Sequence, residues 1–413
     1  MRILEGAAAP RYVQKLERRG QQLDALQPGV RRILQSVRED GDRSLRRYAE
    51  RWDGLQSASS LRVPESELQS ALKDSPGEFR AALQAMAASI RSFAEWQRPE
   101  QWKRIKQGRT LGQVVRPLGS VGCYVPGGRY PLPSTLLMTV IPAQVAGVKE
   151  IRVVSPRPAR ATLAAAALLG VREFYRVGGA QAVAALAYGT ETIPRVDKIV
   201  GPGNLYVTTA KKLVAFDCAI DFLAGPTEGL ILCDEGKAEF IASDLVAQAE
   251  HDPDALVLLI TRSRKLAGDV SRVAASLARA NEVARQALKA HGAVLLATSR
   301  QQAVDWANRI APEHLTTTEK HLPDIVNAGS VFIGDYSAQA AGDYGSGPNH
   351  VLPTGGAARS RGGLSVLDFL KVITVQELSR RGLRKIAPSI IALAEAEGLQ
   401  AHAQSIRVRC GHA

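Results

Sequence analysis

The sequence predicts an α/β protein with parallel sheets, preceded by a helical segment and followed by a small helical unit. Three observations indicate this: helical patterns fill about the first hundred residues, short β-rich runs alternate with helical runs from residue 118, and helical spacing returns after residue 359. Alternating strands and helices are typical of parallel sheets with right-handed crossovers. A chain of 413 residues is also long enough for two or more domains.

The N-terminal segment carries apolar residues at helical spacing, with charged residues on the other faces. Two stripes show this pattern: Val30, Ile33, Leu34 and Val37, then Phe79, Leu83, Met86, Ile90 and Phe93. After Arg359, the spacing of Leu364, Leu367 and Leu370, and then of Ile390 and Leu393, predicts a C-terminal helical unit behind a Gly-rich linker at 355–363.

Between these segments lie the predicted strands: 119–124, 151–155, 174–177, 198–200, 229–233, 256–261, 293–297 and 329–334. A weak repeat, AGVKEIRVVSP (146–156) and LGVREFYRVGG (169–179), joins a helix end, a charged turn and a strand. Gly147 and Gly170 stand where a helix C-cap favours a left-handed residue. We therefore expect successive α–β units of one sheet.

The net charge of +13 raises the question of nucleic-acid binding. The basic residues mostly alternate with acidic ones, which is typical of solvated helices, and no nucleic-acid-binding motif accompanies them. We expect no nucleic-acid partner, although a basic surface can attract anionic ligands such as a dinucleotide.

Composition also bears on the compartment. The four cysteines are scattered without a C-x-x-C pair, which suits a reducing compartment. The N-terminus lacks a signal-peptide pattern. The most apolar stretch, 134–148, is too short to span a bilayer and contains Pro142, so it predicts a buried helix. We expect a cytoplasmic protein without membrane contact.

Three Gly-rich turns, 125–131, 177–182 and 201–204, each follow a predicted strand. In open α/β sheets ligands bind beyond the carboxyl ends of the strands, where the backbone can approach a phosphate. None of the turns has the G-x-G-x-x-G pattern, and glycine after a strand often forms only a turn. The three turns therefore have two possible interpretations, a ligand-binding cleft or ordinary turns.

A set of histidines with polar neighbours is more specific. Gln248 and His251 are three residues apart on one helical face, so they can offer an amide oxygen and an imidazole to one metal; a capping histidine is the alternative. His314 follows Glu313, and other pairs are Asp343 with His350 and Glu397 with His402. Singly each histidine fits a structural role, but together they suit zinc or a similar ion. His291, His321 and His412 lack such neighbours and are expected on the surface.

Several long stretches resemble one known family in order and spacing. They are VGCYVPGGRYPLPSTLLMTVIPAQVAGV, VGGAQAVAALAYGT, VDKIVGPGN, IDFLAGPTE, SDLVAQAEHDPDA, APEHL, AGSVFIGDYSAQAAGDYGSGPNHVLPT, LSVLDFLKVITVQELSRRGL and AEAEGLQAH. On these residues the chain resembles the histidinol dehydrogenases along nearly its whole length.

The resemblance implies two incomplete Rossmann-like domains. The first, discontinuous over 21–123 and 228–362, would carry zinc and the catalytic residues, and the second, 124–227, would bind the nucleotide. Residues 1–20 would form an N-terminal helical arm, and 363–413 a C-terminal helical dimerisation tail.

The resemblance also implies roles for particular residues. One zinc per subunit would be bound by Gln248, His251, Asp343 and His402, with Glu313 and His314 as the catalytic pair. Substrate would be contacted by the four zinc ligands, Glu313, Thr227, His350 and Glu397, and NAD by Tyr124, Gln181 and Asn204. The family forms an intertwined homodimer in which the last zinc ligand comes from the other subunit, so His402 and Glu397 would belong to a shared site.

The implied activity is oxidation of L-histidinol to L-histidine through histidinal, with two NAD. A near-neutral base such as His314 suits proton removal from the alcohol, and Glu313 suits activation of water. In a regular strand these two side chains would face opposite sides, so we expect an irregular chain at Pro312.

The sequence departs from the family at two positions. Thr227 replaces the usual serine, and Gly229 replaces an aliphatic residue, which weakens strand packing. These departures leave open a second hypothesis, a related dehydrogenase acting on another small polyol or amino alcohol. A third hypothesis, motivated by the charge alone, is a nucleic-acid-binding protein that keeps the fold.

Overall fold

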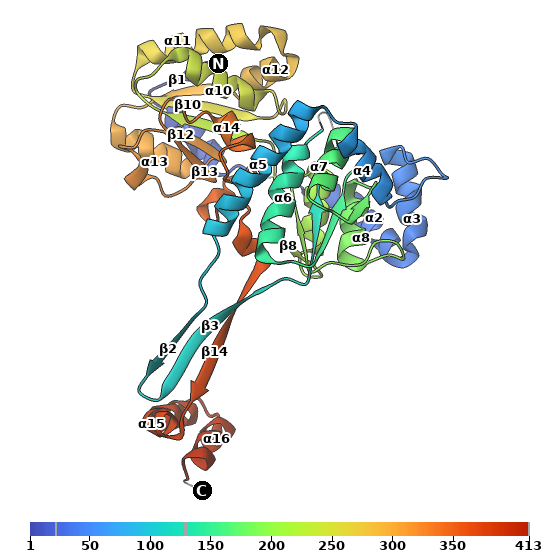
Figure 1. The fold of residues 1–413 in the computed structure, drawn as a ribbon. Coiled ribbons are helices and arrows are strands. Elements are labelled where there is room, and N and C mark those ends of the chain that lie inside the picture. The colour runs from blue at the N-terminus through green and yellow to red at the C-terminus, as the bar shows by residue number, and fades with distance from the viewer. Residues whose placement is uncertain (21–22, 128–130, 412–413) are drawn as a thin grey trace.

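The computed structural model describes residues 1–20, 23–127 and 131–411. Two helix-covered sheets form the body of the molecule, and a thin arm that ends in two helices projects from it (Figure 1). The predicted α/β class with parallel sheets is confirmed. No helix among the described residues is both long and apolar enough to cross a membrane.

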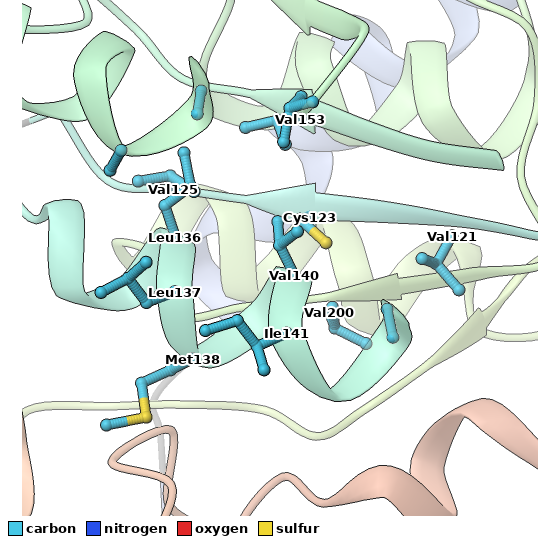
Figure 2. Close-up of a cluster of buried hydrophobic side chains, with 14 of the residues drawn as sticks. Val121, Cys123, Val125, Leu136, Leu137, Met138, Val140, Ile141, Val153 and Val200 are labelled. Carbon is cyan, nitrogen blue, oxygen red and sulfur yellow. The ribbon is translucent and has the colours of Figure 1, made fainter. Parts of the chain in front are cut away.

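One sheet has five parallel strands in the order β6-β5-β4-β7-β8. The strands are β4 (Ser120–Tyr124), β5 (Glu150–Val154), β6 (Glu173–Tyr175), β7 (Lys198–Val200) and β8 (Ala219–Ile220), and the helices between them are α6 (Pro133–Ala146), α7 (Arg160–Leu168), α8 (Gly179–Tyr188) and α9 (Leu205–Val214). Helix α6 is buried almost all round and packs its apolar residues against β4, β5 and β7 (Figure 2). The expected buried helix at 134–148 is confirmed.

The N-terminal helices pack on this same sheet unit. They are η1 (Asp24–Leu26), α2 (Gln27–Asp40), α3 (Asp42–Tyr48), η2 (Ala49–Asp53), α4 (Glu65–Lys73) and α5 (Gly77–Trp96). Helix α2 contacts α8 and α9, α4 contacts α7, and α5 contacts α6. The apolar stripe of α2 therefore belongs to the core around β4–β7.

The second sheet has six parallel strands in the order β1-β11-β10-β9-β12-β13. The strands are β1 (Arg2–Leu4), β9 (Glu228–Leu232), β10 (Leu256–Thr261), β11 (Ala293–Leu296), β12 (His314–Thr317) and β13 (Ser330–Ile333). The helices are α1 (Ala8–Glu17), α10 (Ala238–Ala249), α11 (Arg264–Leu277), η3 (Ala278–Ala280), α12 (Glu282–Ala290), α13 (Arg300–Ile310), η4 (Leu322–Asp324), α14 (Gln339–Tyr344) and η5 (Ala357–Arg359). The short helix η6 (Val366–Phe369) packs against α6 of the five-stranded unit instead.

The projecting arm is an antiparallel sheet, β14-β3-β2, made of β2 (Trp102–Lys106), β3 (Arg109–Pro117) and β14 (Leu370–Leu378). It ends in the tail helices α15 (Arg380–Ala396) and α16 (Gln400–Cys410). The predicted helix through residue 370 is wrong beyond Phe369, where the β-branched run Val372–Val375 forms an extended strand instead. Both faces of β14 are exposed.

The structure groups the chain differently from the expected domain boundaries. Residues 23–96 and β4, expected with the zinc-binding domain, pack in the five-stranded unit because their apolar faces meet α6–α9 and β5. Residues 1–20, expected as an N-terminal helical arm, contain the helix α1 and join the six-stranded unit, where β1 pairs with β11 and Arg19 forms an ion pair with Glu228 at 2.6 Å. Residues 363–413 include β14 as well as helices.

Candidate active site

A cavity of about 170 Å³ lies between the two sheet units. From the five-stranded unit it is lined by Leu132, Ser134 and Thr135 at the start of α6 and by Pro202 in the loop after β7. From the six-stranded unit it is lined by Thr227, Gln248, His251, Glu313, His314, Asp343 and His350, among others. The six-stranded sheet contributes the amino ends of β9 and β12, whereas the five-stranded sheet contributes its carboxyl edge, as expected for ligand-binding loops.

Thr227, just before β9, lies between two buried side chains. Its Oγ1 is 3.0 Å from Oε1 of Gln248 and 2.8 Å from Oε2 of Glu313, yet a hydroxyl has one proton to donate. Nε2 of Gln248 is buried without a hydrogen-bond partner. If the two ends of this amide are exchanged, Nε2 donates to Thr227, Thr227 donates to Glu313, and a buried amide oxygen stays open as an acceptor.

Glu313 and His314 both reach the cavity because the chain is irregular before β12. Ala311 has a left-handed φ of +49°, Pro312 follows, and β12 begins only at His314. The Oε2 atom of Glu313 accepts a hydrogen bond from the Glu228 amide at 2.9 Å and lies 3.6 Å from Nδ1 of His314. The expected irregularity at Pro312 is confirmed.

His314 is buried among acceptors. Its Nδ1 is 3.4 Å from the Glu228 carbonyl, and its Nε2 is 3.7 Å from Oδ1 of Asp343. Burial lowers the pKa of His314, but the carboxylates of Glu313 and Asp343 outweigh it and raise the pKa to about 10. The cavity therefore holds two carboxylates that attract positive charge.

His350 connects the two sheet units. Its Nδ1 lies 2.8 Å from the Asp343 carbonyl, which can only accept, so Nδ1 donates and Nε2 is left to accept from Thr135 Oγ1 at 3.2 Å. Burial lowers the pKa of His350, which favours this neutral form. Burial raises the pKa of Asp343, but its interaction with the nearby His314 ring, together with charge from His350 and His251, lowers it overall.

Gly229 does not line this cavity. A Cβ there would lie 3.0 Å from Cγ of Gln248 and 3.1 Å from Oε1 of Gln339. The space that an aliphatic residue would take is thus already filled by these two side chains, and Gly229 does not enlarge the cavity.

Two expected site residues lie elsewhere in the chain. Glu397 caps the end of α15 and His402 lies in α16, both exposed on the tail at the far end of the arm (Figure 1). One chain therefore gathers Gln248, His251 and Asp343 but not His402. Consistent with this, no group of three or more His, Cys, Asp or Glu side chains suited to a metal ion occurs among the described residues.

The three residues expected to contact NAD meet in a second cleft of about 950 Å³. Tyr124 ends β4, and its hydroxyl, whose pKa is raised by burial, accepts from the Gly179 amide at 3.0 Å. Gln181 is buried in α8, and Asn204 caps α9 by accepting from the amides of Tyr206 and Val207. The loop 201–204 borders both cavities, since Pro202 lines the first and Asn204 the second.

All three Gly-rich turns border these cavities, although residues 128–130 of the first turn lie outside the described residues. Sequence reasoning missed the N-terminal wall of the second cleft, including Trp52 and Asp53, because it assigned those helices to the other domain. His321, expected on the surface, is buried and hydrogen-bonded to Thr317 at 3.0 Å; His412 lies outside the described residues.

Comparison with known proteins bears on this arrangement. The histidinol dehydrogenase family model matches residues 16–410. The chain belongs to the histidinol dehydrogenase family. A histidinol dehydrogenase of Methanothermobacter thermautotrophicus is 48% identical over 402 residues, covering 94% of this chain and 93% of that protein. One of Aquifex aeolicus is 44% identical over 405 residues, covering 95% of each chain.

A solved histidinol dehydrogenase structure from Elizabethkingia anophelis superposes with a TM-score of 0.93 at 35% identity, covering 98% of this chain and 96% of that one. The two sheet units, the arm and the tail helices therefore form the fold of a histidinol dehydrogenase.

Proposed function

We propose that this chain oxidises L-histidinol to L-histidine through histidinal, using NAD and one zinc ion per subunit of a homodimer. The observation that carries the proposal is the convergence of Gln248, His251, Asp343, Glu313 and His314 on one cavity beside a nucleotide-sized cleft. Membership of the family supports the same substrate.

The donor set fits a zinc ion. Gln248 can present an unpaired buried amide oxygen, His251 an imidazole and Asp343 a carboxylate, and these are ligands that zinc accepts. We assign the fourth position to His402 of the partner subunit. A zinc ion bound here supplies a positive centre that can hold the imidazole and amine of histidinol in their neutral forms.

The protein groups account for the proton movements. The carboxylates beside the ring favour the imidazolium, and a cation held on Asp343 would offset one of them, so His314 would be neutral before the reaction and could take the hydroxyl proton as hydride leaves the carbinol carbon for NAD. Water then adds to the aldehyde, with Glu313 removing a proton from it, and the hydrate loses a proton and a second hydride, which a second NAD would accept, to give the acid. Thr227 and the Glu228 amide hold Glu313 in place, and His350 orients the substrate.

The dimer is supported by the arm. Trp102, Ile105, Val372 and Ile373 are 44%, 79%, 52% and 46% exposed in a single chain, an apolar surface that a second copy would cover. Exchange of the tail between subunits would account for Glu397 and His402, which lie far from the cavity of their own chain. The four cysteines are free thiols, which supports a cytoplasmic enzyme.

The test is to count NADH formed per histidinol by the purified protein with zinc and NAD. Two NADH per substrate are expected, and a chelator should abolish turnover. One NADH with accumulated aldehyde would contradict the two-step reaction. His314→Asn should lose turnover and keep zinc, whereas His402→Ala should lose zinc; full zinc content in the latter would contradict the ligand assignment.

The second hypothesis is that the substrate is another small polyol or amino alcohol. Gly229 does not support this hypothesis, because it lies outside the cavity wall and leaves the cavity unchanged. A panel of alcohol substrates tests this hypothesis. A strong preference for an alcohol without an imidazole would contradict histidinol as the substrate.

A further inference from the structure

The main chain of Glu228 contacts both members of the proposed catalytic pair. Its amide donates to Oε2 of Glu313 at 2.9 Å, and its carbonyl oxygen lies 3.4 Å from Nδ1 of His314. The pairing of β9 with β12 places it there, because His314 stands opposite Gly229 in the sheet register. The position of Glu228 at the start of β9 therefore helps to set where both catalytic side chains lie.

Arg19, in the segment after α1, holds the side chain of Glu228. The Glu228 side chain is 6% exposed, and its two oxygens accept from Nε of Arg19 at 2.7 Å and from Nη2 at 2.6 Å. Oε1 also accepts from the Gly355 amide at 2.9 Å. Two parallel N–H donors fix the orientation of a carboxylate as well as balancing its charge. The start of β9 is therefore anchored by a carboxylate that cannot turn freely.

The other donors of Arg19 reach the irregular turn before the catalytic pair. Nη1 donates to the carbonyl of Leu16 at 2.8 Å and to that of Ile310 at 2.7 Å, and Nη2 lies 3.5 Å from the Ala311 carbonyl. The left-handed φ of Ala311, +49°, is unfavourable for an alanine, so surrounding contacts must hold it. One guanidinium thus joins the start of β9 to the turn that leads through Pro312 into β12.

We infer that Arg19 and the Glu228 carboxylate are positioning residues for Glu313 and His314. The inference rests on the proposed function and adds two residues that act through the main chain. Among the described residues that line the cavity, neither Arg19 nor Glu228 occurs. Without the guanidinium, a buried carboxylate loses its cation and the turn loses its bonded carbonyls, so the catalytic side chains shift relative to the substrate.

The proposed zinc ligands are held by other elements. Gln248 belongs to α10, His251 follows that helix, and Asp343 belongs to α14. Among the described residues, the side-chain hydrogen bonds of Arg19 go to β9 and to the ends of α1 and α13 instead. Loss of Arg19 should therefore slow the chemical step while zinc and histidinol still bind.

The test compares kcat, KM and zinc content of the full-length enzyme with those of Arg19→Ala. We expect kcat to fall about ten- to a hundredfold, KM for histidinol to change less than about threefold, and zinc content to stay the same. Millimolar guanidinium chloride should restore part of kcat, because the free ion can bind the Glu228 carboxylate in place of the missing side chain. Guanidinium weakens folding, so it would not rescue a variant that was merely unstable.

Arg309→Ala is the matched control. Arg309 forms an ion pair with Glu17 at 3.0 Å and so also joins α1 to α13, but its other ion pair among the described residues is with Asp305 of its own helix. This variant should keep the wild-type kcat and gain nothing from guanidinium. An equal loss of kcat in the Arg19 and Arg309 variants would show that any tie between these helices matters, and would overturn the inference.

Glu228→Gln keeps the volume of the side chain and removes its charge, so it decides the question even if Arg19→Ala does not fold. It should also lower kcat, and the double variant should lose no more than the weaker of the two single variants, because both changes break one contact. Wild-type kcat in a folded Arg19→Ala or Glu228→Gln, or a loss in Arg19→Ala that guanidinium leaves unchanged, would overturn the inference. If the wild-type protein does not oxidise histidinol, the proposed function fails instead.

Discussion

Lys211 and Asp221 form a buried ion pair beneath the loop that separates the two cavities. Their side chains are 2% and 0% exposed, Lys211 Nζ donates to the Gly201 carbonyl at 3.0 Å, and Asp221 Oδ2 accepts from the Gly201 amide at 2.7 Å. Gly201 has φ +110°, and a Cβ there would lie 2.2 Å from the Tyr124 carbonyl oxygen. The pair thus holds a glycine that no other residue can replace.

Removing one member of this pair should destabilise the fold strongly. Lys211→Met leaves the Asp221 carboxylate buried without its cation, which should cost about 3–5 kcal/mol in the free energy of unfolding. Urea denaturation measures this. The double variant Lys211→Met/Asp221→Asn should recover part of the loss, and equal stability of the single and double variants would contradict the pairing.

Thr227 should tolerate serine but not valine. Valine keeps the shape of threonine but removes the hydroxyl, leaving Gln248 and Glu313 without their shared partner at a cost of about 1–3 kcal/mol. Turnover and zinc affinity should both fall. Thr227→Ser keeps the hydroxyl and should stay near the wild-type values in both assays; a valine variant that matches it would show that the hydrogen bonds are dispensable.

Two inactive variants should restore activity when combined. In a mixed dimer of His314→Asn and His402→Ala, one site receives both defects and the other receives neither. Unfolding and refolding the two proteins together should therefore yield about a quarter of the wild-type turnover, because half of the dimers are mixed. Each variant refolded alone is the control, and no gain on mixing would rule out a site shared in this way.

Asp244 should make the stability of the protein depend on pH in the acid range. Burial raises its pKa to about 6, although the Gln339 amide donates to it. The folded state then binds the proton more tightly than the unfolded chain, so the contribution is full below the unfolded value near 3.8 and is lost as the pH rises through about 6.

Asp244→Asn should remove this slope and be more stable than the wild type at pH 7. Urea denaturation from pH 4 to 8 gives the difference between the two proteins, in which the titrations they share cancel. A difference that does not change with pH would contradict the raised pKa.

Local sequence patterns were sufficient to predict eight strands and the buried helix α6. Elements that are buried on both faces contain long apolar runs, which are visible in the sequence. The same patterns did not predict β2, β3 and β14. The sheet that these strands form has no buried face in the single chain, so their sequences lack the alternation of apolar and polar residues that a half-buried strand shows. Strand β12 was missed because His314–Thr317 contains a histidine and two threonines and so lacks a continuous apolar run.

The resemblance named seven residues that the structure gathers at one cavity, but it did not indicate the contacts that support them. The shared hydroxyl of Thr227, the left-handed Ala311 and the bridge from His350 to Thr135 join residues far apart in the sequence. The grouping of the N-terminal helices with the five-stranded unit depends on which apolar faces meet, and periodicity alone does not specify that.

The exposed arm also bears on how the chain is produced in the cell. Strand β2 is an open sheet edge, and every residue in it is exposed. Such an edge is a template for indiscriminate strand addition, so a newly synthesised chain is prone to aggregate until its arm is covered. Slow expression at low temperature should therefore raise the yield of folded protein.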